Sequence, residues 1–185
     1  AVIVHPENPI SGLTTEQIAQ LFAGQITNWR QLGGEDVPVS LYARDNNSGT
    51  WDTFSSLVMG KSYSLDSSAK RYESNDQLSD NVSQDRGAIG FVGLASVRDA
   101  KLLAVAEKDT SAIKPDTFSV ATEDYPLSRR LFFYLPETGV PDAAREYVEF
   151  CQSQQGQEIV ADVGFVSQNL ITFDPIVPST APDSY

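Results

Sequence analysis

Short apolar runs alternate with helical patterns along most of this chain, and this alternation limits the possible folds more than any other feature. Runs with the length and the β-branched or aromatic content of buried strands occupy 1–5, 37–43, 88–92, 102–105 and 131–135. Helices are predicted at 14–24, 50–59, 76–84, 142–153 and 154–162. The sequence therefore predicts an α/β sandwich.

The first helix has the clearest boundaries. Thr14 and Gln17 have the spacing of a capping box, in which each side chain bonds the other residue's backbone N–H. Gly24 follows the apolar stripe and supplies a stop. At the other end of the chain, Pro and Ser are frequent from Asp174 onward, so 174–185 is predicted to be a linker.

Net charge and cysteine content exclude several classes of function. The formal charge is −12, from 25 acidic and 13 basic residues, which argues against a nucleic-acid partner. The single cysteine, Cys151, excludes an intramolecular disulfide and a multi-cysteine zinc site. We predict no metal and no cofactor. The sequence has no signal-peptide pattern, so we expect the mature form of an exported protein or a cytosolic one.

The segment from Arg44 to Phe54 carries the most chemical information. Ser48, Gly49 and Thr50 fall where a strand gives way to a helix, and the first N–H groups of a helix lack intrahelical acceptors. Glycine permits close approach of a ligand to the backbone, and the hydroxyls add donors. Arg44 offers a planar fork that matches two oxygens of a tetrahedral anion. This pattern predicts an oxyanion-binding site.

The same residues also fit a purely structural interpretation. Ser-Gly-Thr before a helix is an ordinary N-cap, and Arg44 could pair with Asp45 or Asp52. The short motif does not decide between the two interpretations.

Further segments, in the same order, resemble the periplasmic phosphate-binding proteins of ABC importers. They include Gly12 to Gln17, Leu21 to Trp29 and Leu32-Gly33-Gly34, the Arg44-x-x-x-Ser48-Gly49-Thr50 loop, 87–92, 125–134 and 157–166. The resemblance covers about 10–170. It implies a type II periplasmic-binding-protein-like α/β fold, with a mixed sheet flanked by helices.

The resemblance also implies a division of the chain. Residues 1–10 would form a hinge strand, and 11–125 an oxyanion-binding lobe. Residues 126–173 would contribute a return strand and helices to the other lobe, and 174–185 a tail. Members of the family begin with a further segment that supplies part of the first lobe, and a site without it should bind weakly.

Site residues carry over by position. Arg44 is similar to the ligand-binding arginine of the family, and Ser48, Gly49 and Thr50 to its donors. Ser74 and Asn75 match a turn that faces the cleft, although an N-cap fits as well. Where the family often has an aspartate, this chain has Asn46, so Asp45 and Asp52 are candidates to orient Arg44 from behind.

The resemblance implies non-enzymatic binding of inorganic phosphate, for uptake or sensing, by a periplasmic or secreted protein. Its partners would be phosphate and the membrane subunits of an ABC importer. The alternative is a cell-envelope structural or adhesion protein with the same fold, linked to an OmpA-like domain and to peptidoglycan. A serine hydrolase is disfavoured, because Ser48 is not in a Gly-x-Ser-x-Gly motif and His5 is the only histidine.

Overall fold

The computed structural model describes residues 1–168, and the predicted tail lies outside them. A five-stranded mixed sheet forms the centre, in the order β4-β3-β5-β1-β6. Its strands are β1 (Val2–Val4), β3 (Ser40–Arg44), β4 (Lys70–Tyr72), β5 (Ala88–Phe91) and β6 (Lys101–Leu102). β3 is parallel to β4 and β5, while β1 is antiparallel to β5 and β6. A second, two-stranded parallel sheet pairs β2 (Gly12–Thr14) with β7 (Ala104–Ala106).

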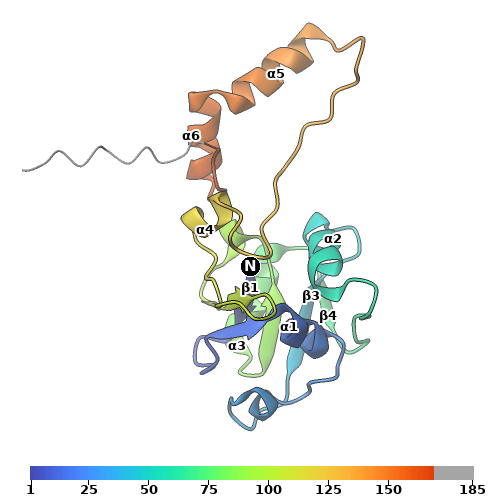
Figure 1. The fold of residues 1–185 in the computed structure, drawn as a ribbon, viewed down its shortest axis with the longest axis vertical. Helices are drawn as coiled ribbons and strands as arrows, with labels where there is room; N and C mark the ends of the chain where they lie inside the picture. The colour runs from blue at the N-terminus through green and yellow to red at the C-terminus, as the bar shows by residue number, and fades with distance from the viewer. Residues whose placement is uncertain (169–185) are drawn as a thin grey trace, which may run out of the picture.

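Helices cover both faces of the central sheet (Figure 1). On one face, Val2, Val4 and Phe91 pack in a cluster with α1 (Thr15–Phe22) and α2 (Gly49–Phe54). On the other face, Ile3 lies in a second cluster with α3 (Asn75–Gln84). Neighbouring residues of β1 thus point to opposite faces, as the pleat requires. The α/β sandwich with a mixed sheet is confirmed.

Local sequence signals account for several of these elements. The Thr14–Gln17 capping box is present, and Gly24 adopts a left-handed φ of 69° after the C-cap of α1. Gly90 permits close contact with α3, because a Cβ there would lie 2.7 Å from Leu78 Cδ2. α2 continues into a π-helical turn, η2 (Ser55–Met59), so the predicted helix over 50–59 is present with two geometries.

Other elements depart from the prediction. The single strand predicted at 102–105 is divided between β6 and β7, which belong to different sheets. Five further elements were not predicted: β2, β4, α4 (Thr117–Ala121) and the short 3-10 helices η1 (Trp29–Leu32) and η3 (Leu94–Ser96). β1, which lies in the predicted hinge segment 1–10, pairs with β5 on one edge and β6 on the other; this pairing does not test the predicted hinge.

The predicted strand at 131–135 does not form. This segment runs as an extended linker to α5 (Asp142–Gln152) and α6 (Gln154–Asp162), two helices that make an arm standing away from the sheet (Figure 1). No strand among residues 1–168 lies beside the linker, and a strand requires a neighbouring backbone to accept and donate its hydrogen bonds. The prediction was wrong because it was made from side-chain pattern alone.

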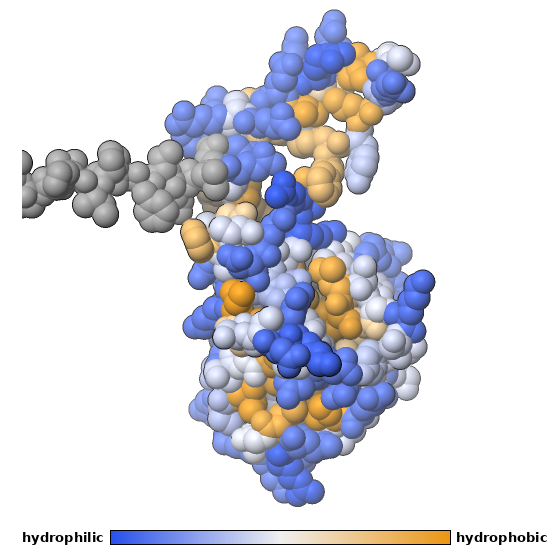
Figure 2. Space-filling model, in the orientation of Figure 1, coloured by the Kyte–Doolittle hydropathy of each residue, from blue (hydrophilic) through white to orange (hydrophobic). Residues whose placement is uncertain are grey.

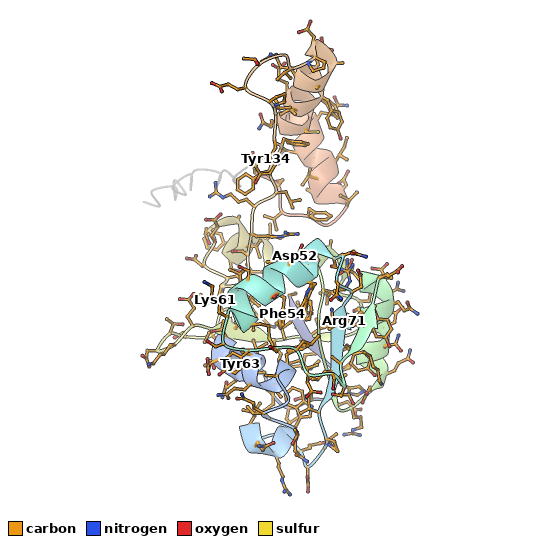
Figure 3. All side chains as sticks on the ribbon, turned by 90° about the vertical axis from the view of Figure 1, so that its right-hand side faces the viewer. Asp52, Phe54, Lys61, Tyr63, Arg71 and Tyr134 are labelled. Atoms are coloured by element: carbon orange, nitrogen blue, oxygen red, sulfur yellow. The ribbon has the colours of Figure 1, made fainter. Side chains whose placement is uncertain are left out.

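The arm and its linker expose many large apolar side chains (Figure 2). Phe133 contacts Tyr147 of α5 edge to face, with ring centroids 6.2 Å apart, yet both side chains are more than half exposed. Tyr134 is 90% exposed and projects from the linker (Figure 3). Within residues 1–168, no helix is both long enough and apolar enough to span a bilayer.

The capping box predicts a specific loss of stability. Thr14 Oγ1 accepts from Gln17 N at 3.1 Å, and Thr14 N donates to Gln17 Oε1 at 2.9 Å. Thr14→Ala removes one of these bonds and should lower the free energy of unfolding by about 1 kcal/mol. Urea denaturation measures this, and Thr14→Ser, which keeps the hydroxyl, should lose much less. Equal losses in the two variants would contradict a capping role.

The hydrogen bonds that Asp85 accepts, one of them from Tyr42 of β3, predict acid sensitivity. Burial tends to raise the pKa of Asp85, but hydrogen bonds from Tyr42, Gly87 and Ser40 outweigh it and hold the pKa below its ordinary value. Tyr42 Oη donates to Asp85 Oδ2 at 2.8 Å. The stabilisation is present above the unfolded-state pKa of aspartate and is lost as the pH falls through the lower folded-state pKa.

Asp85→Asn should therefore lose less free energy of unfolding than the unmodified chain when both are acidified across that range. Denaturant titrations at a series of pH values measure the difference. Asp99→Asn is the control, because Asp99 is exposed and makes no ion pair among the described residues. If the free energy of unfolding of Asp85→Asn fell as steeply with decreasing pH as that of the unmodified chain, the proposed role of this carboxylate would be contradicted.

Candidate functional site

Arg44 is the last residue of β3, and its side chain is buried with 8% exposure. Its guanidinium extends across the end of β4 to the turn before α3. Nε donates to the Tyr72 carbonyl at 3.2 Å, and Nη2 donates to the Glu73 carbonyl at 2.7 Å. Nη1 donates to Asn75 Oδ1. These three bonds fix the orientation of Arg44 and leave two of its five N–H groups for another acceptor.

The predicted residues Arg44 and Asn75 are thus brought into direct contact. Asn75 Oδ1 also accepts from Gly93 N at 3.3 Å, so this amide joins three segments of the chain. Ser74 is the N-cap of α3, and its hydroxyl accepts from Gln77 N at 3.2 Å. The Ser74 side chain therefore caps α3, which is the structural role that its sequence position also fitted.

The Ser48-Gly49-Thr50 turn begins α2, as predicted. Ser48 is buried, and its Oγ accepts from Thr50 N at 3.2 Å and from Trp51 N at 3.3 Å. The ordinary N-cap is therefore present, and it occupies two amides that the oxyanion hypothesis would use. The Gly49 N–H and the Thr50 hydroxyl make no hydrogen bond within the described part of the chain. These two donors remain available to a ligand.

Asp45 and Asp52 do not orient Arg44, contrary to expectation. Asp45 Oδ1 accepts from Asn47 N at 2.7 Å and closes the turn before α2. Asp52 lies exposed in the first turn of α2 (Figure 3), where its charge complements the helix dipole. Neither carboxylate contacts the Arg44 guanidinium in residues 1–168. The 72–75 turn takes their place, because parallel pairing of β3 with β4 puts Arg44 opposite Tyr72.

Two further arginines border this region, and the sequence analysis missed both. The Arg71 guanidinium lies over the Trp51 ring, 4.7 Å from its centroid, and Nη1 donates to the Arg44 carbonyl at 3.0 Å. Arg129 Nη2 lies 3.3 Å from the point where a Cβ on Gly49 would be. β4 is short and exposed and Arg129 is far away in sequence, so no local pattern indicated either residue.

The chain matches a known family and several known proteins. The family model for a PBP superfamily domain matches residues 1–155. The chain belongs to the PBP superfamily. The chain is 33% identical over 178 residues to the protein SphX of Synechococcus elongatus, covering 89% of this chain and 52% of the relative. It is 27% identical over 169 residues to the phosphate-binding protein PstS of Bacillus subtilis, covering 90% and 54%.

Solved structures agree with these matches. A phosphate ABC transporter substrate-binding protein from Clostridium perfringens, solved with bound phosphate, superposes with a TM-score of 0.75 at 29% identity. The match covers 90% of this chain and 67% of that one. An ABC-type phosphate transport receptor from Vibrio cholerae gives a TM-score of 0.71 at 27% identity, covering 90% and 68%. This PBP superfamily member is PstS-like, and the predicted family and type II fold are confirmed.

The match covers only part of the length of these relatives. The PBP superfamily chain described here spans about half the length of the curated relatives that it matches. The site residues, from Arg44 to Arg129, all lie in the part of the chain that the family model covers.

The Arg44–Asn75 contact predicts a cost for removing the amide. Asn75→Ala leaves a buried, charged N–H of Arg44 without its acceptor, so the free energy of unfolding should fall by about 1–3 kcal/mol. Gln84→Ala, at the exposed end of the same helix, is the control and should change it by less than about 0.5 kcal/mol. Chemical denaturation of the two variants measures the difference. Similar small effects would show that Asn75 does not hold Arg44.

Proposed function

We propose that this chain binds inorganic phosphate without covalent chemistry, as a periplasmic or secreted solute-binding protein that serves phosphate uptake or sensing. The observation that carries the proposal is the buried Arg44, whose positive charge is held entirely by neutral groups. Two backbone carbonyls and one amide oxygen orient it, and no carboxylate neutralises it within residues 1–168. Such an arginine keeps its full attraction for an anion.

The anion would sit between Arg44 and the start of α2. The remaining guanidinium N–H groups, the Gly49 N–H and the Thr50 hydroxyl are the donors proposed to contact it. Asn75 holds the guanidinium, and Ser48 fixes the turn by capping. Gly49 is exposed and, apart from Arg129, has no neighbour within 4 Å of its Cβ position, which leaves room for a ligand.

The relatives support phosphate as the anion and an importer as the context. The names of three of the matched proteins specify phosphate binding or phosphate transport, and one of these, a solved relative, contains bound phosphate. By analogy, the partner of this chain would be the membrane subunits of an ABC importer. The net charge of −12 does not oppose this, because exposed charges are screened beyond about 8 Å at physiological ionic strength.

Titration calorimetry with inorganic phosphate tests the proposal. The unmodified chain should bind, and Arg44→Lys should weaken binding at least about tenfold, because lysine cannot reproduce the planar fork. Arg30→Lys is the control, since Arg30 is an exposed arginine paired with Asp36 at 3.2 Å. It should leave the Kd unchanged.

Unfolding curves recorded without phosphate establish that the Arg44→Lys protein is folded. Phosphate should also raise the unfolding midpoint of the unmodified chain as its concentration exceeds the Kd. No heat of binding and no midpoint shift for the unmodified chain would refute phosphate binding. An unchanged Kd in folded Arg44→Lys would refute the role of Arg44 alone.

A further inference from the structure

The arginines of this acidic chain that have a carboxylate partner and those that lack one lie in different regions. Most of those on the outer surface of the sandwich are neutralised by carboxylates: Arg30, Arg86, Arg98 and Arg130 each lie within 4 Å of an acidic side chain. Arg44, Arg71 and Arg129 have no carboxylate partner within residues 1–168. Arg44 begins the segment from 44 to 51, and Arg71 and Arg129 lie against that segment. Arg145, on the arm, is the remaining arginine in this state.

The three arginines reach this region from three different parts of the sequence. Arg44 enters the region from β3. Arg71 (labelled in Figure 3) enters it from β4, and its guanidinium stacks on Trp51. Arg129 comes from a distant part of the sequence and is exposed. In a chain with a net charge of −12, three such guanidinium groups around one turn produce a local positive field.

Arg129 is held in place by the residues that precede it. Tyr125 is 2% exposed, and its carbonyl accepts from Ser128 N at 3.0 Å and from Ser128 Oγ at 2.8 Å. This anchored turn places the Arg129 guanidinium beside Gly49. A Cβ atom added to Gly49 would lie 3.3 Å from Arg129 Nη2 and 3.8 Å from Nη1. Gly49 supplies one of the two free donors of the Ser48-Gly49-Thr50 turn, so Arg129 borders the place where the anion would bind.

The neighbouring arginine provides an internal comparison. Arg130 directs its Nε to Glu123 Oε1 and is neutralised there. Two adjacent, exposed arginines thus differ in one respect: one forms an ion pair on the surface, and the other lies against the start of α2 without a carboxylate.

We propose that Arg129 is a second cationic contact for the bound oxyanion and that, together with Arg44, it makes the site select doubly charged over singly charged anions. The inference rests on the proposed function, since it assigns a residue and a charge preference to the same site. Arg44 would contact the anion from the β3 side, and Arg129 would contact it from the solvent side of Gly49. Arg71, which stacks on Trp51 and donates to the Arg44 carbonyl, contributes through its field.

Charge selection follows from the number of cations. Phosphate loses its second proton close to neutral pH, so mildly acidic and mildly basic solutions present mainly the singly and the doubly charged ion. A second guanidinium interacts more strongly with the doubly charged form, because the Coulomb energy scales with the product of the charges. Loss of Arg129 should therefore weaken binding more at higher pH.

Titration calorimetry of the full chain with inorganic phosphate, at about pH 6 and about pH 8, tests this. Arg129→Ala should raise the Kd about tenfold at the higher pH and clearly less at the lower pH. Arg130→Ala is the matched control: it removes the same charge one residue away and should leave the Kd within about twofold at both pH values. Arg129→Lys keeps the charge without the fork and should fall between the unmodified chain and Arg129→Ala.

The possible results are distinguishable. A selective, pH-dependent loss in Arg129→Ala supports the assignment. Phosphate binding by the unmodified chain with equal Kd values for Arg129→Ala and Arg130→Ala would overturn it while leaving the proposed function intact. A loss that is the same at both pH values would overturn the charge preference. No binding by the unmodified chain would overturn the proposed function and this inference together.

Discussion

Burial of the central strands on both faces is the constraint on which the rest of the structure depends. β1 and β3 alternate their side chains between the cluster under α1 and α2 and the cluster under α3. A one-residue shift of register would exchange those faces, so the register is strongly specified. Because β3 is fixed in this way, the residue at its end and the turn that follows it occupy defined positions.

Arg44, at the end of β3, is the residue whose position this constraint fixes. A buried guanidinium must be hydrogen-bonded, and carboxylates usually provide the bonds. Here the Tyr72 and Glu73 carbonyls and the Asn75 amide provide them, so the charge is oriented without being neutralised. This arrangement stabilises the contact of β3 with β4 and α3, and it also leaves the arginine suited to an anion. Structural and binding roles are compatible in one side chain.

Much of the fold was predictable, because its signals are local. The Thr14–Gln17 box, the Gly24 stop and the apolar runs of β1 and β5 depend on residues within a few positions of one another. Elements that exist through distant pairing were missed. β4 has an exposed, basic sequence and forms only because β3 lies beside it. The run at 131–135 has a strand sequence but no neighbouring strand among residues 1–168, so it stays an extended linker.

For the site, the sequence alone determined which residues lie at the end of β3 and at the start of α2, since chain order places Arg44 before Ser48, Gly49 and Thr50. It did not determine what holds Arg44, nor that Arg129 lies against Gly49. Those contacts join residues 28 to 80 positions apart, and only the packing of strands and of the Tyr125 turn brings them together. Local hydrogen-bonding patterns are encoded in neighbouring residues, whereas the partners of a buried charge are chosen by the tertiary fold.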